Sequence, residues 1–281
     1  MPSEMVWLHE YMNVLSSCIP YDKSLLSSVT GCVCVCATAV FKPTTTDALK
    51  SAVNTYCKSS NGLCNPHQPQ GHAPINEWDV SEVTSMEKMF YKATHFKDDI
   101  SKWDVAKVTT MVSMFEYAKS FNGDISKWKV GNVIDMQRMF VGAASFNNDV
   151  SNWDVAKVSN MNGMFAYIGF NGDISKWNVG AVTRMDFMFQ RARSFKSDVS
   201  KWNVAKVTEM EFMFSEATSF NSDISKWNVA KVTSMRSMFE TATSFNGDIS
   251  NWDVGKVTST EDMFKDAKSF NSDISKWNVG R

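Results

Sequence analysis

Tryptophan recurs at a fixed interval along most of this chain, and the other hydrophobic residues keep their places relative to it. The series is Trp78, Trp103, Trp128, Trp153, Trp177, Trp202, Trp227, Trp252 and Trp277. The interval is 25 residues except once, where it is 24 because a residue is missing between Phe165 and Phe170. Fixed-period self-similarity of this kind predicts a repeat architecture in which each turn packs on its neighbours.

The hydrophobic spacing around each tryptophan favours a short strand. In the turn of Trp202, Val199, Trp202 and Val204 follow the spacing L-x-x-L-x-L that is typical of strands in repeat coils. Alternate side chains of a strand point to opposite faces, so we expect tryptophan and valine to point inward.

The pattern then changes to helical spacing. Met210, Met213, Phe214 and Ala217 fall at i, i+3, i+4 and i+7, which is one face of a short helix. The pair Thr208 and Glu211 has the spacing of a capping box at its start, as do Thr84 with Glu87 and Thr258 with Glu261. We therefore predict an α/β solenoid with one short parallel strand and one short helix in each 25-residue turn.

The segment that precedes the repeats is predicted to cap them. Thr45 or Thr46 precedes a run in which Leu49, Ala52 and Val53 share one helical face. We divide the chain into an N-terminal segment (1–41), a helical cap (42–74) and the repeat region (75–281).

The repeats resemble a known family. The sequence FNSDISKWNVAKVTSMRSMF (220–239) is typical of turns that run from Ile75 to Arg281. It is similar to the 25-residue repeats of BspA-like leucine-rich-repeat surface proteins, in the branch of mycoplasma surface lipoproteins and algal and protist proteins. The resemblance implies a leucine-rich-repeat-like fold and a secreted or cell-surface role in adhesion or protein binding. It implies no catalytic activity.

Residues 1–41 allow three interpretations. An uncharged run from Leu25 to Phe41, ending near Ala37-Thr38-Ala39, suits a signal peptide cleaved before Val40. Acidic residues such as Glu4 and Glu10 do not suit such a leader, so an intact buried segment and a membrane anchor stay open.

Composition argues against a role in nucleic-acid binding. The chain carries 29 basic and 30 acidic residues, for a formal net charge of −1, so no general attraction to phosphate is expected. No nucleophile–base pair and no glycine-rich phosphate loop occurs in the sequence, and we predict no catalytic residue, no cofactor and no bound metal.

All six cysteines lie at or before residue 64. Cys57, Cys64, His67 and His72 could be considered as zinc ligands, but their spacing does not match the usual zinc-finger pattern. A Cys57–Cys64 disulfide or free thiols are the preferred interpretation, and secretion would permit the disulfide.

An aspartate recurs once per turn, in turns of the type Asn-Gly-Asp or Asn-Ser-Asp. The column is Asp99, Asp124, Asp149, Asp173, Asp198, Asp223, Asp248 and Asp273. The favoured interpretation is that each carboxylate accepts backbone N–H groups in its own turn. Calcium bridging between turns and a ligand surface are alternatives.

The residues on either side of each tryptophan are the candidate binding surface. The candidates are Lys102, Asp104, Lys127, Lys129, Lys176, Asn178, Lys201, Asn203, Lys226 and Asn228. Three consecutive turns repeat Lys-Trp-Asn, which suits a protein or glycan ligand on the strand face. The alternative is an ordinary solvated face, because lysine is common on soluble surfaces.

Two other functions stay open. One is a passive structural or matrix element that self-associates, since the final strand at Trp277 has no following helix and its exposed edge could pair with a second molecule. The other is ice binding, suggested by a threonine column at Thr84, Thr109, Thr183, Thr208, Thr233 and Thr258. Ile134 interrupts that column, and the capping role already explains it.

Overall fold

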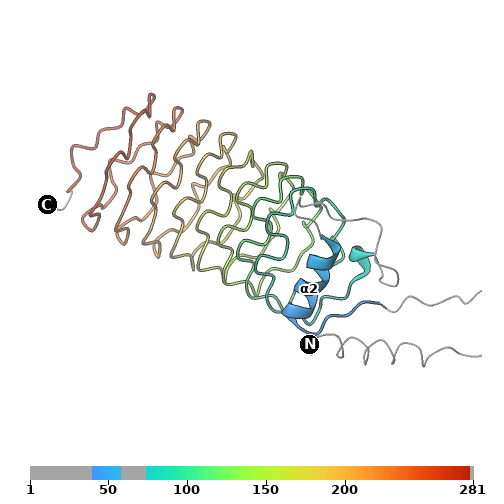
Figure 1. Ribbon diagram of the computed structural model, residues 1–281. Coiled ribbons are helices and arrows are strands. Elements are labelled where there is room, and N and C mark those ends of the chain that lie inside the picture. The colour runs from blue at the N-terminus through green and yellow to red at the C-terminus, as the bar shows by residue number, and fades with distance from the viewer. Residues whose placement is uncertain (1–39, 58–73, 279–281) are drawn as a thin grey trace, which may run out of the picture.

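The protein is a stack of similar turns, closed at one end by a helix (Figure 1). The computed structural model describes residues 40–57 and 74–278. Within these residues the regular elements are helix α2 (Thr46–Tyr56) and the short 3₁₀ helix η3 (Ile75–Glu77). The remainder of the described chain winds through the repeated turns.

Neighbouring turns are joined by isolated parallel bridges instead of strands. One residue per turn takes part, and the series is Ser85, Thr110, Asp135, Asn160, Arg184, Glu209, Ser234 and Ser259. No bridge in the described chain extends into a sheet. The prediction of one strand and one helix per turn is therefore wrong, although the 25-residue period that it rested on is correct.

The methionine–phenylalanine segment is not a helix because its N–H groups point to the next turn. The N–H groups of Met210, Phe212 and Phe214 donate to carbonyl oxygens of Ser234, Arg236 and Met238. Within the turn, the N–H of Met213 donates to the oxygen of Met210, a three-residue reach typical of β-turns. Successive β-turns place every third or fourth side chain inward, so they reproduce the spacing of a helix face.

The segment around each tryptophan is also built from local turns. The N–H of Trp202 donates to the oxygen of Val199, and that of Val207 donates to the oxygen of Val204. A strand would offer these groups to a neighbouring strand. Here they are satisfied three residues away, so valine and tryptophan point inward without a sheet.

Two positions in every turn have left-handed backbone. The first column is Lys88, Ser113, Arg138, Gly163, Phe187, Phe212, Ser237 and Asp262. The second column is Lys92, Tyr117, Gly142, Tyr167, Arg191, Glu216, Thr241 and Asp266. All have φ between 49° and 65°. This conformation costs a non-glycine residue about 1–2 kcal/mol, and the hydrogen bonds between turns offset that cost.

The core consists of stacked columns of identical side chains. Phe115 and Phe140 stack with their centroids 5.6 Å apart, and Phe115 lies 3.9 Å from Phe121 of its own turn. Met111, Met114 and Phe115 are completely buried, and Trp103 is almost so. The predicted inward residues are thus confirmed, even though the predicted elements are not.

Helix α2 covers the first turn as the sequence predicted. Thr45 is its N-cap and accepts the N–H of Ala48 at 3.1 Å. Leu49 and Val53 are buried against the first turn. Lys42 adds an ion pair to Asp79 at 2.8 Å, so the cap is held by both apolar and charged contacts.

The last described turn is less buried than the others. Phe264, Phe270, Ile274 and Trp277 pack against the core but are only partly buried. Among the described residues, the N–H groups of Asp262 and Phe264 have no carbonyl partner, whereas their equivalents Ser237 and Phe239 donate to the next turn. Self-association at this edge stays a prediction.

Candidate functional site

The residues that flank the tryptophans form one exposed strip, which we call the Trp-flanking strip. Its members are Lys102, Asp104, Lys127, Lys129, Lys176, Asn178, Lys201, Asn203, Lys226 and Asn228, and all ten side chains are exposed. Each flanks a buried tryptophan, so the strip is fixed in place by the core beneath it.

The tryptophans align this strip by hydrogen bonding from turn to turn. The indole N–H of Trp202 donates to the oxygen of Ile174 in the preceding turn at 3.1 Å. Trp202 and Trp227 stack with centroids 6.5 Å apart and 2° between their planes. Lys201 and Lys226 therefore follow each other in a straight column.

The asparagines and aspartates of the strip have a structural role that the sequence analysis did not assign. The side-chain oxygen of Asn203 accepts the N–H of Ala205, and that of Asp104 accepts the N–H of Ala106. Asn178 makes the same contact to Gly180. These contacts are Asx turns, in which Asn and Asp are the preferred residues. The recurring tripeptide Asn-Val-Ala is the sequence signal that could have predicted these turns.

The aspartate column caps its own turns, as the favoured interpretation predicted. Asp173 accepts the N–H of Ser175 at 2.9 Å, and each of the other seven aspartates accepts the N–H two residues onward. The hydrogen bonds from Ser175 lower the pKa of Asp173, and the charge of Lys176 lowers it further. In the described parts of the chain no three such groups are close enough to hold a metal ion.

The neighbouring carboxylates balance much of the positive charge of the strip. Lys176, Lys201 and Lys226 lower the pKa values of Asp173, Asp198 and Asp223 through their charge. The lysines of the strip therefore lie close to a column of carboxylates, and the combined surface is not purely basic. Such a surface favours ligands that offer both donors and acceptors.

The cysteine prediction falls mostly outside the described residues. Cys57 is disulfide-bonded. Cys64, His67 and His72 lie outside the described part of the chain. The Cys57–Cys64 pairing thus stays a prediction.

The threonine column joins turns and is not a helix cap. The N–H and hydroxyl of Thr208 both donate to the oxygen of Thr183, the hydroxyl at 3.3 Å. Thr258 makes the same pair of bonds to Thr233. The capping-box prediction is wrong because no helix follows these threonines in the described chain. The hydroxyls of Thr109, Thr183, Thr208, Thr233 and Thr258 donate to the preceding turn, and ice binding stays untested.

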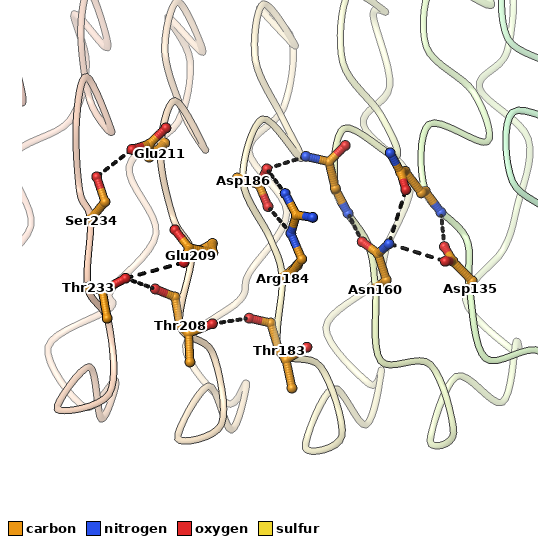
Figure 2. A network of polar contacts seen from close by, with 12 residues as sticks. Asp135, Asn160, Thr183, Arg184, Asp186, Thr208, Glu209, Glu211, Thr233 and Ser234 are labelled. Atoms are coloured by element: carbon orange, nitrogen blue, oxygen red, sulfur yellow. Dashed lines mark hydrogen bonds and ion pairs between the residues drawn. The ribbon is translucent and has the colours of Figure 1, made fainter.

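Beside the threonine column runs a network of polar side chains that differs from turn to turn (Figure 2). Asn160 donates to Asp135 and Gln137 at 3.2 Å in each case. Asp186, which is buried, accepts from Arg184 and from Asn162. The sequence analysis missed this network because its residue types change in every turn.

A family model matches the repeats. The family is described as "Mycoplasma protein of unknown function, DUF285", and it matches residues 64–171, 167–232 and 197–281. Together these segments span residues 64–281, which is more than half of the chain. The chain belongs to the DUF285 family. No curated protein and no solved structure matches it.

The DUF285 match agrees with the mycoplasma-type repeat that the sequence resembled. The finer assignment to BspA-like leucine-rich repeats is not established by it. As to membranes, no helix within the described residues has the length and apolar character needed to cross one.

Proposed function

We propose that this DUF285 protein is a non-catalytic, secreted or cell-surface scaffold that binds a protein or glycan through the Trp-flanking strip. The observation that carries the proposal is the exposure of all ten strip residues directly over a fully packed tryptophan column. The resemblance of the repeats to BspA-like surface proteins supports the location and the adhesive role.

The geometry of the strip suits an extended ligand. Lys176, Lys201 and Lys226 are equivalent residues of consecutive turns, and their spacing follows the stack at about 4.8 Å per turn. The backbone that carries these lysines is already rigid before a ligand binds. Binding therefore costs little conformational entropy beyond that of the lysine side chains. Glycan hydroxyls or a peptide backbone could meet the lysines and the neighbouring carboxylate groups.

A glycan and protein array probed with the full chain tests the proposal. For a ligand found in this way, Lys176→Glu, Lys201→Glu and Lys226→Glu combined should abolish binding, with an unchanged circular dichroism spectrum. The matched control is Lys206→Glu, Lys231→Glu and Lys256→Glu, three exposed lysines of another column in three consecutive turns. Equal affinity of both triple variants for the ligand would refute the assignment to this strip.

A passive, self-associating structural element is the second candidate function. It is favoured by the partly exposed core residues of the last described turn, such as Phe270 and Trp277. An array without any ligand, together with concentration-dependent assembly, would favour this candidate over the first.

A further inference from the structure

The exposed and half-buried residues of the two left-handed columns form a surface separate from the Trp-flanking strip, and we call it the variable face. Ser113, Gly163 and Ser237 of the first column are buried and are not part of it. The core columns repeat the same residue in nearly every turn, but the variable face carries lysine, arginine, aspartate, tyrosine, phenylalanine and glycine at equivalent positions. Because left-handed backbone favours glycine, bulky residues at these positions are not explained by the local conformation.

Aromatic side chains are exposed on this face. Tyr117 is 37% exposed and Tyr167 is 46% exposed. Phe187 and Phe212 are half-buried and stack on each other at 5.0 Å. Exposed tyrosine on a polar face is typical of protein–protein interfaces.

Charge is ordered along the face. The first turn carries Lys88 and Lys92, and the last described turn carries Asp262 and Asp266. Within these two columns the ends of the stack therefore carry opposite charges, although Glu87 pairs with Lys88 at 3.1 Å and Lys265 pairs with Asp262 at 3.5 Å in the same chain. A face with this arrangement is complementary to a copy of itself that runs in the opposite direction.

We propose that the variable face binds a second copy of this chain, antiparallel, with a two-fold axis between the turns of Trp153 and Trp177. In this arrangement each column faces its own counterpart in reverse order. Lys88 and Lys92 then lie opposite Asp262 and Asp266 of the second copy, and the same contacts occur at both ends. A single rotation thus satisfies both charged ends of the dimer.

The middle of the face brings a cation opposite an aromatic ring under the same rotation. Tyr167 lies opposite Arg191, a pair that already stacks within one chain with the guanidinium 5.2 Å from the ring.

The available area is sufficient for a dimer of modest affinity. Eight turns at about 4.8 Å give a face roughly 35 Å long, and two side-chain columns with their neighbours cover on the order of 600 Å² per copy. This lies near the lower limit for stable interfaces, so we expect dissociation in the micromolar range. The inference does not depend on an external ligand, and an array that finds none would leave it intact.

Sedimentation equilibrium of the full chain tests the proposal by exchanging the charged ends. We expect a dimer for the wild type, and a dimer at least tenfold weaker for Lys88→Asp with Lys92→Asp, because both ends then place aspartate against aspartate. The reverse variant, Asp262→Lys with Asp266→Lys, should be weakened similarly. An equimolar mixture of the two variants should regain wild-type affinity, because every pair becomes opposite in charge again.

The matched control is Lys201→Asp with Lys226→Asp, which makes the same change in net charge on the Trp-flanking strip and should leave the dimer unchanged. Both charge-exchange variants use residue types that already occur in these left-handed columns, so the backbone tolerates them. A wild-type chain that is monomeric at about 100 μM would overturn the proposal, as would a dimer that the mixture does not restore. A dimer that persists in both charge-exchange variants would place the contact elsewhere and overturn it too.

Discussion

The indole N–H of Trp202 donates to the carbonyl oxygen of Ile174, one turn earlier, at 3.1 Å. The same oxygen also accepts the N–H of Trp177, so one buried carbonyl joins two turns. Equivalent indole bonds run along the stack from Trp103 to Trp277. The tryptophan column therefore holds neighbouring turns together by hydrogen bonds as well as by packing.

Replacing Trp202 by phenylalanine should lower the free energy of unfolding by about 2–3 kcal/mol, because it removes a buried hydrogen bond and leaves a small cavity. Trp277→Phe is the control, since Trp277 is only partly buried, and we expect a loss below about 1 kcal/mol. Urea denaturation of both variants measures the difference. A loss below about 1 kcal/mol for Trp202→Phe would mean that the buried indole bond and the packing around it contribute little.

The two glycines of the left-handed columns should respond differently to alanine. Both have positive φ, 65° at Gly142 and 62° at Gly163, so each alanine variant should lose about 1 kcal/mol from backbone strain. A Cβ at Gly142 would also lie 2.6 Å from the Tyr117 ring, whereas the nearest atom to a Cβ at Gly163 is 3.5 Å away. Gly142→Ala should therefore be the more destabilising.

Removing the ring separates these two contributions. In a Tyr117→Ala background, Gly142→Ala should lower the stability of the fold by no more than Gly163→Ala does in the wild type. Thermal unfolding of Gly142→Ala, Gly163→Ala, Tyr117→Ala and the Tyr117→Ala, Gly142→Ala double variant would show this. A stabilising effect of Gly163→Ala would contradict the left-handed backbone, because in a helix alanine is more favourable than glycine by about 1 kcal/mol.

The ion pair between Arg138 and Glu116 joins two turns. The carboxylate of Glu116 is 5% exposed and receives both the Nε and an Nη of Arg138, at 3.1 and 2.5 Å. Arg138→Ala should cost about 1–3 kcal/mol, because it leaves a buried carboxylate without its partner. The control, Arg193→Ala, removes a side chain that is 67% exposed and should cost less than about 0.5 kcal/mol in the same denaturation assay.

The cap should loosen in acid. Hydrogen bonds from Lys42 and then Ser81 lower the pKa of Asp79 to about 2, well below its ordinary value. A lowered carboxyl pKa stabilises the folded state above the unfolded pKa of about 4, and this contribution is lost as the pH falls toward 2. Both partners are at least a third exposed, so the effect is at most about 1 kcal/mol.

Asp79→Asn should therefore have a lower melting temperature than the wild type above pH 5, and the difference should shrink between pH 4 and pH 2. Asp47→Asn in helix α2 serves as the comparison for a general loss of one carboxylate. A difference between wild type and Asp79→Asn that stays constant down to pH 2 would contradict this role for the ion pair.

The sequence predicted which residues point inward but not the backbone that places them there. The spacing of Met210, Met213, Phe214 and Ala217 fits a helix and a series of β-turns equally well, because both place those four side chains on one side. The decisive feature is left-handed backbone at Phe212 and Glu216, and neither residue type indicates it. Glycine marks such a position only at Gly142 and Gly163.

Local turn chemistry was easier to predict than the contacts between turns. The caps at Thr45 and Asp173 depend on residues next to them in the sequence, and both are confirmed. The buried pair of Arg184 and Asp186 and its link to Asn162 depend on which turns are adjacent and on residue types that occur once. A repeat pattern is defined by residues that recur in every turn, so it does not predict contacts between residues that occur in one turn only.

The most direct test of this fold is the backbone measured at Phe212 and Glu216 in a crystal structure of the protein. We predict φ near +55° at both residues, with the N–H groups of Met210, Phe212 and Phe214 donating to oxygens of the next turn. A continuous helix through residues 209–217, with φ near −60° and hydrogen bonds four residues apart, would contradict the account.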